Sequence, residues 1–152
     1  MNVPPRPRVV VCEDGDEYLA RFSRFLTAEV DLVPARDWRS AQLACAVGAA
    51  ALLLDLDFRR LAPDRLVDES GATAVGRPTA EAERLAPIQG VLILRALRAA
   101  GLTTPALLFA DFDDDAGRAR FLERTLAPLQ VVSGSEGMAS IAARLRVLLA
   151  PR

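Results

Sequence analysis

Short apolar runs recur along the chain, and each is followed by a stretch in which apolar residues return at helical spacing. Strands buried on both faces read as continuous apolar runs, whereas a helix that lies on a sheet shows one apolar face. The runs therefore predict five buried strands. They lie at 8–12, 30–33, 50–54, 105–110 and 129–132.

The stretches between the runs predict five helices. Leu19, Phe22, Phe25 and Leu26 fall on one face of a helix that is expected to end near Ala28. Similar apolar faces mark the other four: Ala41, Leu43, Ala44 and Val47; Val91, Leu92, Leu94, Leu97 and Ala100; Phe121, Leu122 and Leu126; and Met138, Ile141, Leu145, Leu148 and Leu149.

Capping residues and helix breakers indicate where these elements begin and end. Asp16, Asp37 and Ser135 each precede a predicted helix, and their side chains are expected to cap its N-terminus. Pro34 is expected to stop the second strand, and Gly48 to end the second helix. Strands alternating with helices predict an open parallel sheet with helices on both faces, whose binding crevice lies at the carboxyl ends of the strands.

The segment 59–88 interrupts this alternation. It is polar and rich in proline and glycine, which favours an insertion after the third strand within one domain that spans 1–152. Its residues 66–75 predict a small hairpin with Gly71 in the turn. Because it follows the third strand directly, the insertion is expected to lie over or beside the crevice, as a lid, a docking surface or a tolerated loop.

Composition narrows the possible functions. With 51% hydrophobic and 26% charged residues and a net charge of -1, the chain is expected to form a globular, cytoplasmic domain without a nucleic-acid or membrane partner. It has no histidine, and all 19 basic residues are arginine, so histidine triads and lysine chemistry are excluded. Cys12 and Cys45 lie in apolar segments and are expected to be reduced and buried.

Carboxylates follow the predicted strands. Glu13 and Asp14 come after the first strand, and Asp55 and Asp57 after the third. Adjacent parallel strands would gather them at one edge, where close carboxylates repel each other unless a hard cation such as Mg²⁺ lies among them. The alternative is a set of solvated loop acids and helix caps, which is the interpretation favoured for Asp16.

Three segments, 10–14, 52–57 and 90–110, resemble the receiver domains of bacterial response regulators. They are similar to the family's first strand with its acidic pair, to its phosphoacceptor strand, and to its third helix and fourth strand. The resemblance covers nearly all of the chain outside 59–88. It implies a flavodoxin-like (CheY-like) three-layer α/β/α fold with a five-stranded parallel sheet, and a role in two-component signal transduction.

The resemblance also implies roles for the acidic residues. Glu13 and Asp14 would hold Mg²⁺, Asp55 would be the phosphoacceptor and a metal ligand, and Asp57 would sit where the family supplies a backbone carbonyl to the metal. A histidine kinase or another signalling protein would be the partner. The surface formed by 116–149 is one that receivers use for pairing, so a homodimer is also expected.

Three positions depart from the family. Ala110 replaces the hydroxyl residue at the end of the fourth strand, Gln130 replaces an aromatic residue on the fifth, and Ser133 replaces the lysine that follows it. A serine hydroxyl cannot supply the charge of a lysine ammonium to a phosphoryl oxygen. We therefore expect a pseudo-receiver: a protein-interaction module, not an enzyme, whose switching is impaired or independent of phosphorylation.

Two alternatives involve the same acids. The segment 52–57 also resembles the nucleophile strand of haloacid-dehalogenase-like, Mg²⁺-dependent phosphohydrolases, with Asp55 as nucleophile and Asp57 as acid or base. In that hypothesis Asp111, Asp113 and Asp114 would be late metal ligands. The pattern of 13–16 with 55–57 is also similar to Toprim-like metal nuclease domains, although no larger DNA-handling chain accompanies it.

Overall fold

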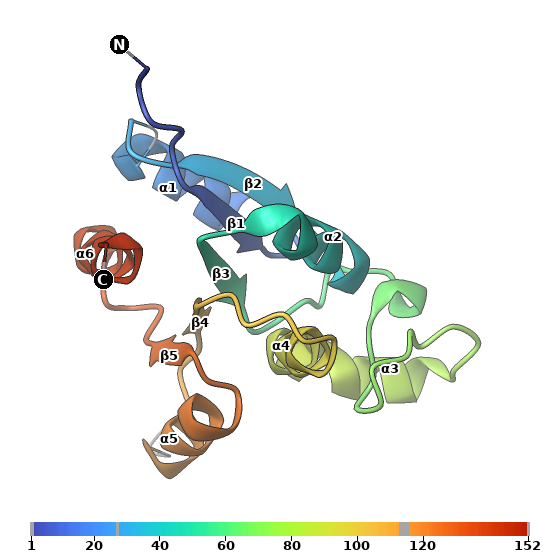
Figure 1. Cartoon of the computed structure of the whole chain (residues 1–152). Coiled ribbons are helices and arrows are strands. Elements are labelled where there is room, and N and C mark those ends of the chain that lie inside the picture. Colours follow the sequence, from blue (N-terminus) through green and yellow to red (C-terminus); the bar gives the residue numbers. More distant parts are fainter. Residues whose placement is uncertain (1, 27, 113–115, 152) are drawn as a thin grey trace.

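Five parallel strands form the centre of the computed structural model, which describes residues 2–26, 28–112 and 116–151 (Figure 1). The sheet order is β2-β1-β3-β4-β5, so the predicted α/β, flavodoxin-like fold is confirmed. The strands are β1 (Arg8–Cys12), β2 (Asp31–Ala35), β3 (Ala51–Asp55), β4 (Ala106–Phe109) and β5 (Leu129–Val132). The apolar residues of β1, β3 and β4 are buried on both faces, which is why these strands read as continuous runs.

Helices cover both faces of the sheet. They are α1 (Glu17–Leu26), α2 (Trp38–Gly48), α3 (Thr79–Leu85), α4 (Gln89–Ala99), α5 (Ala116–Thr125) and α6 (Met138–Leu149). On one face α1 and α6 pack through Phe22, Leu26, Ile141 and Leu145. On the other face the second apolar cluster joins α2, α4 and α5 to the sheet (Figure 1).

Some predicted apolar positions lie outside these clusters. Phe25 on α1 is 48% exposed, and on α2 Leu43 and Val47 are 68% and 73% exposed. On α2 the buried residues are Ala41 and Cys45, which are small enough for the helix to lie close to the sheet. Helical spacing therefore predicted these helices but overestimated the width of their buried faces.

Two of the three predicted caps are wrong. Asp37 does cap α2, in a capping box with Ser40. Ser135 does not cap α6, because Gly137 occupies the N-cap position and the helix has no side-chain cap. The Asp16 carboxylate accepts a hydrogen bond from Arg36 at 2.7 Å, while its backbone carbonyl starts α1 by accepting from the Ala20 amide.

The edge strand β2 continues past Pro34 to Ala35, although Pro34 was expected to stop it. Asp31 donates its amide toward β1, and Ala35 accepts a hydrogen bond from the Glu13 amide of the chain that continues β1. Backbone groups alternate in direction along a strand, so the nitrogen of Pro34 faces outward. A proline there removes no hydrogen bond from the sheet, which explains why the strand tolerates it.

The segment 59–88 is more ordered than its composition predicted. Its small hairpin is present, with an antiparallel bridge between Val67 and Thr73 and with Gly71 at a φ of 84°. The helix α3, which the sequence did not predict, brings the number of α-helices among the described residues to six. The segment places Leu61, Leu66, Val67, Ala74, Ala82 and Leu85 in the same apolar cluster as α4.

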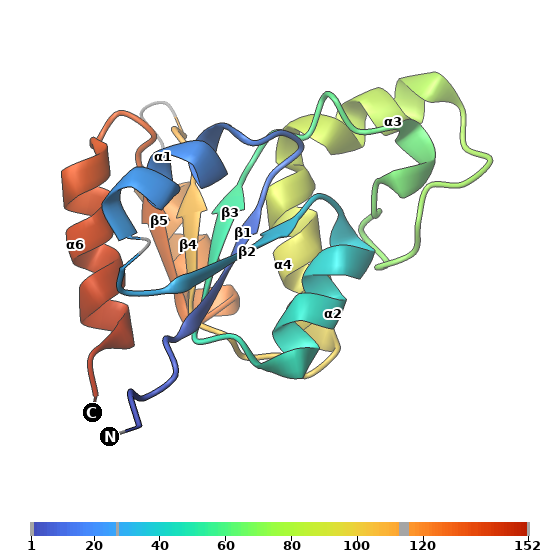
Figure 2. The same cartoon turned by 90° about the horizontal axis from the view of Figure 1, so that it is seen from above.

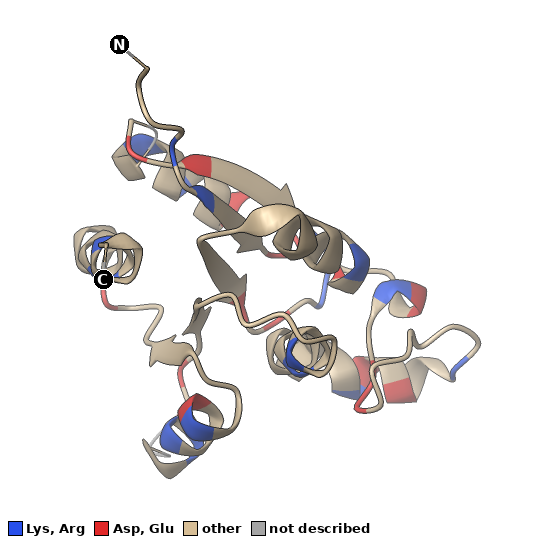
Figure 3. Ribbon diagram, viewed as in Figure 1, with Lys and Arg blue, Asp and Glu red and all other residues tan. Residues whose placement is uncertain are grey.

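Charges are spread over the surface. Figure 3 shows basic and acidic positions next to each other on α5 and around α3. Cys12 and Cys45 are free thiols, and both are buried as expected. Among the described residues no helix is long and apolar enough to cross a bilayer.

Candidate functional site

The acidic residues follow neighbouring strands at one edge of the sheet. Cys12 pairs with Leu54 across β1 and β3, so Glu13 and Asp55 are the next residues of two adjacent parallel strands. We call Glu13, Asp14, Asp55 and Asp57 the acidic cluster. In Figure 2 the strands point toward this edge, and the chain enters β1 and leaves α6 at the opposite edge. The predicted gathering of carboxylates is therefore present.

Glu13 caps the N-terminus of α1 with its carboxylate. Its carboxylate is 3% exposed and accepts hydrogen bonds from the amides of Tyr18, at 3.1 Å, and Leu19, at 2.9 Å. These are N–H groups of the first helical turn, which have no partner within the helix. Burial raises the pKa of Glu13, and the two hydrogen bonds oppose that rise. Glu13 thus does what the sequence assigned to Asp16.

Asp14 is paired with an arginine from the segment after β3. The Arg60 amide donates to Oδ2 of Asp14 at 2.9 Å, and its guanidinium Nη2 donates to Oδ1 at 3.1 Å. The same guanidinium binds both carboxylate oxygens of Glu17, at 2.6 and 2.9 Å. This bidentate pair lowers the pKa of Glu17 to about 2. One arginine therefore links β1, α1 and the segment after β3.

Within the acidic cluster, Asp55 forms the fewest hydrogen bonds and ion pairs with the described residues. It is half-buried, and its Oδ1 accepts a hydrogen bond from the Leu56 amide at 2.9 Å. Burial is the main cause that raises its pKa from 3.8 to about 6; the nearby charges of Asp14, Glu13 and Asp57 contribute to the rise, and the Leu56 hydrogen bond opposes it. The charged form of Asp55 is thus disfavoured in the folded protein. A cation bound beside it would favour that form, so a raised pKa of this kind is typical of functional sites.

We expect the substitution Asp55→Asn to stabilise the protein above pH 6. Because the pKa of Asp55 is raised on folding, the stability due to its proton is complete below pH 3.8 and is lost as the pH rises through about 6. At pH 8 the neutral amide should increase the free energy of unfolding by about 1.5 kcal/mol. Urea unfolding with EDTA at pH 8 and at pH 3.5 measures the difference, which should vanish at the lower pH.

The control for this prediction is Asp57→Asn. The side chain of Asp57 is 42% exposed and pairs with Arg59 at 2.9 Å, and an ion pair so open to solvent contributes little. Its substitution should change stability by less than about 0.5 kcal/mol. Two results would contradict the prediction that the charged form of Asp55 destabilises the folded protein. One is equal stabilisation by the two asparagine substitutions, and the other is stabilisation by Asp55→Asn that persists at pH 3.5.

The cluster as folded does not offer a ready metal site. Glu13 faces the amides of α1, Asp14 is bound by Arg60, and Asp57 turns to Arg59. Within the described ranges, no group of three or more acidic or cysteine side chains is placed to hold a metal ion. The four residues have the chemistry that Mg²⁺ prefers, but their oxygens do not converge in this arrangement.

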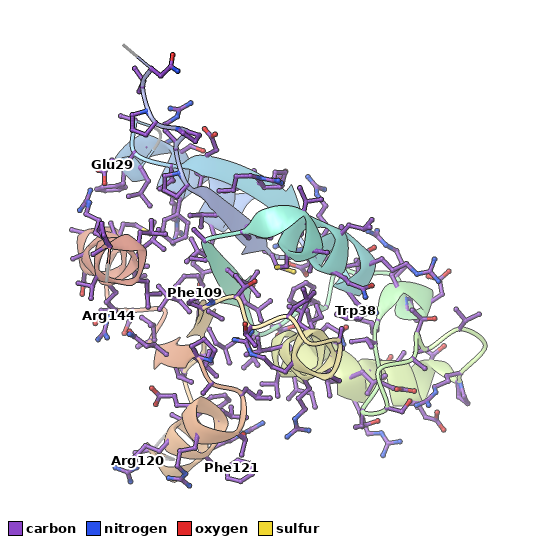
Figure 4. All side chains as sticks on the ribbon, viewed as in Figure 1. Glu29, Trp38, Phe109, Arg120, Phe121 and Arg144 are labelled. Carbon is purple, nitrogen blue, oxygen red and sulfur yellow. The ribbon has the colours of Figure 1, made fainter. Side chains whose placement is uncertain are left out.

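Aromatic rings lie beside the cluster. Phe109 pairs with Asp55 in the register of β3 and β4, and it stacks on Tyr18 with ring centroids 4.6 Å apart. Phe109, which is labelled in Figure 4, also stacks on Phe22. The register shows that the residue level with Asp55 on β4 is Phe109, and the predicted position, Ala110, comes one residue later. Neither residue carries a hydroxyl.

Small polar residues follow the last strand, β5. The Ser133 hydroxyl, which follows β5, donates to the carboxylate of Asp111 and shares a 2.8 Å hydrogen bond with Ser135. Gln130 lies half-buried on β5 beside Leu107 of β4. Asp111 is thus held at the end of β5, and Asp113 and Asp114, the other acids of the phosphohydrolase hypothesis, lie outside the described residues.

Arg60 and the stacked pair Tyr18 and Phe109 were missed by the sequence analysis. The signal for Arg60 was its place five residues after Asp55 in a chain whose cations are all arginine. In the sequence, only their general apolar character marked Tyr18 and Phe109, which does not separate a residue beside the site from any other core residue. The parallel register brings the strand ends, and the segments that follow them, together at one edge of the sheet, which is why these three residues lie near one another.

Solved structures of receiver domains share this fold. The receiver domain of the Francisella response regulator 1452 matches with a TM-score of 0.66 at 14% identity, over 95% of this chain and 97% of that one. The BeF3-activated receiver domain of Klebsiella pneumoniae RstA matches with 0.61 at 18% (95% and 99%). Vibrio cholerae CheY4 matches with 0.64 at 12% (95% and 99%). No family model and no curated protein matches the sequence.

Proposed function

We propose that this chain is an atypical receiver domain in signal transduction, which acts mainly as a protein-interaction module and does not depend on phosphorylation for its state. The fold is that of receiver domains, which are signalling modules and not enzymes as a rule. The observation that carries the proposal concerns the described residues at the ends of β4 and β5: they are Phe109, Ala110 and Ser133, and none of them supplies a positive charge to a phosphoryl group.

The charge around Asp55 supports this proposal. A phosphoryl group on Asp55 would add about two negative charges to a site that already raises the pKa of its own carboxylate. Stabilising that charge needs a positioned cation, and the chain contains no lysine. The guanidinium of Arg60 is engaged by Asp14 and Glu17. The phosphorylated form of Asp55 would therefore be unfavourable in free energy, and we expect it to change the conformation of the domain only slightly.

A small phosphodonor gives a direct test. After incubation with acetyl phosphate and Mg²⁺, the intact mass of the protein should show little or no phosphoryl adduct. Asp55→Asn provides the baseline for nonspecific adducts. A stoichiometric adduct that disappears in Asp55→Asn and shifts many backbone NMR signals would overturn the proposal.

We propose that the acidic cluster binds Mg²⁺ only weakly. If bound, the ion would be held by Glu13, Asp14, Asp55 and the chain near Asp57, and it would offset their mutual repulsion. These residues would first have to leave their present partners, namely the α1 amides and Arg60. We therefore infer an affinity well below that of a preformed site.

The partner is proposed to be a histidine kinase or another signalling protein. Two surfaces are candidates for contact. One is the 59–88 segment, whose first two residues contact the acidic cluster and whose apolar residues pack with those of α4. The other is 116–149, where Phe121 is 49% and Val147 73% exposed, and where a second copy of the chain could bind.

A further inference from the structure

Arg60 occupies the centre of a network that connects three parts of the site. It contacts Asp14 through its backbone amide and its guanidinium, and it contacts Glu17 of α1 through both terminal nitrogens. A bidentate arginine pair has fixed geometry and is stronger than an ordinary surface ion pair. The segment after β3 is thereby attached to the start of α1.

The contact with Asp14 covers that carboxylate. The side chain of Asp14 is 4% exposed, whereas that of Arg60 is 58% exposed, so the arginine lies on the solvent side. Both oxygens of Asp14 receive a hydrogen bond from Arg60. A cation approaching from solvent could gain an oxygen of Asp14 only by displacing the guanidinium.

Gly15 makes room for the arginine. A Cβ atom at this position would come within 2.6 Å of Nη2 and 2.8 Å of Nη1 of Arg60, and it would also clash with the Glu17 carboxylate. The backbone of Gly15 does not have a positive φ, so the turn itself does not demand glycine. The absence of a side chain at this position is what allows the guanidinium to lie against the turn.

We infer that Arg60 is a built-in counter-cation that takes the place of a divalent ion in the acidic cluster. Metal binding and the Arg60 contact then exclude each other, and the cluster is metal-independent as long as the contact is closed. This inference deepens the proposed function and concerns the same site. It requires neither a partner nor a phosphodonor, so it can fail while the interaction-module proposal stands.

The test compares the Mg²⁺ affinity of the wild-type protein with that of Arg60→Gln and Arg36→Gln. Both variants lose one positive charge, but Arg36 pairs with the exposed Asp16, which is not part of the acidic cluster. Mg²⁺ titration followed by backbone NMR shifts and by calorimetry should show affinity at least about tenfold higher in Arg60→Gln than in the wild type. Arg36→Gln should stay within about threefold of the wild type.

Two further variants keep the result interpretable. Gly15→Ala retains every charge but pushes the guanidinium aside, so it should also raise the Mg²⁺ affinity. The double substitution Asp14→Asn with Arg60→Gln should abolish the gain, because the released carboxylate is gone. Circular dichroism shows whether each variant is folded.

Three results would overturn the inference. They are a folded Arg60→Gln variant with unchanged affinity, equal gains in Arg36→Gln and Arg60→Gln, and tight Mg²⁺ binding by the wild type with the Arg60 signals unperturbed. A stoichiometric phosphoryl adduct, in contrast, would refute the proposed function and leave the comparison of these variants valid.

Discussion

The substitution Gln89→Leu should lower the free energy of unfolding by about 3 kcal/mol. Gln89 is fully buried at the start of α4, where its Oε1 accepts from the Val67 amide at 2.8 Å and its Nε2 donates to the Val67 carbonyl at 3.1 Å. Leucine has a similar size but leaves both backbone groups of the buried Val67 without these partners. Each such group costs about 1 to 3 kcal/mol.

Urea unfolding measures this loss, and amide hydrogen exchange locates it. The exchange of Val67 should increase more than that of β1 and β3, because the side chain of Gln89 ties the hairpin of the 59–88 segment to α4. Gln130→Leu is the matched control, since Gln130 is half-buried on β5, and it should change stability by less than about 1 kcal/mol. A loss below about 1 kcal/mol in Gln89→Leu would contradict this role.

The substitution Gly90→Ala should destabilise the protein by about 2 kcal/mol, although alanine is the better helix former. An added Cβ would overlap the carbonyl oxygen of Asp55 and lie 3.0 Å from the Cα of Leu56. Both obstacles are backbone, so no side chain can move to relieve them. The overpacking costs about 3 kcal/mol, and the helix propensity of alanine returns about 1 kcal/mol.

This substitution should also disturb the acidic cluster. The Gly90 amide donates to the Leu56 carbonyl at 2.9 Å, so α4 lies directly against the chain that carries Asp55. We expect the backbone NMR signals of 55–57 to shift, together with a lower midpoint of thermal unfolding. Gly134→Ala is the control, because a Cβ there would meet only ordinary contacts at 3.5 Å or more. An equal or higher midpoint in Gly90→Ala would refute the close approach.

The fold could be predicted because its three central strands, β1, β3 and β4, are buried on both faces. Runs such as 9–12 and 51–54 have one simple explanation in a chain of this length, and the alternating helices then require parallel pairing. The helix α3 was missed because its residues lie in a polar stretch and only Ala82 and Leu85 are buried. The predicted end of β2 was two residues too early, because Pro34 was expected to stop the strand. Its nitrogen faces outward, so it removes no hydrogen bond from the sheet.

The sequence predicted which acidic residues gather at the site, but it did not predict their hydrogen-bond and ion-pair partners. That Glu13 and Asp55 follow adjacent strands is a consequence of topology, which the apolar pattern determines. The partners depend on side-chain reach: Glu13 is long enough to turn back to the amides of α1, and Arg60 can reach across to Asp14. The chain has 19 arginines, and nothing in the spacing of charges distinguishes the one that enters the cluster.

Pro34 has a consequence for how copies of this protein could associate. The outer side of β2 is an open sheet edge, and a proline whose nitrogen faces outward offers no donor to an incoming strand. Continuous sheets that run from one molecule to the next are disfavoured at this edge. Fibril-like growth by strand addition is thereby directed away from the β2 side of the molecule.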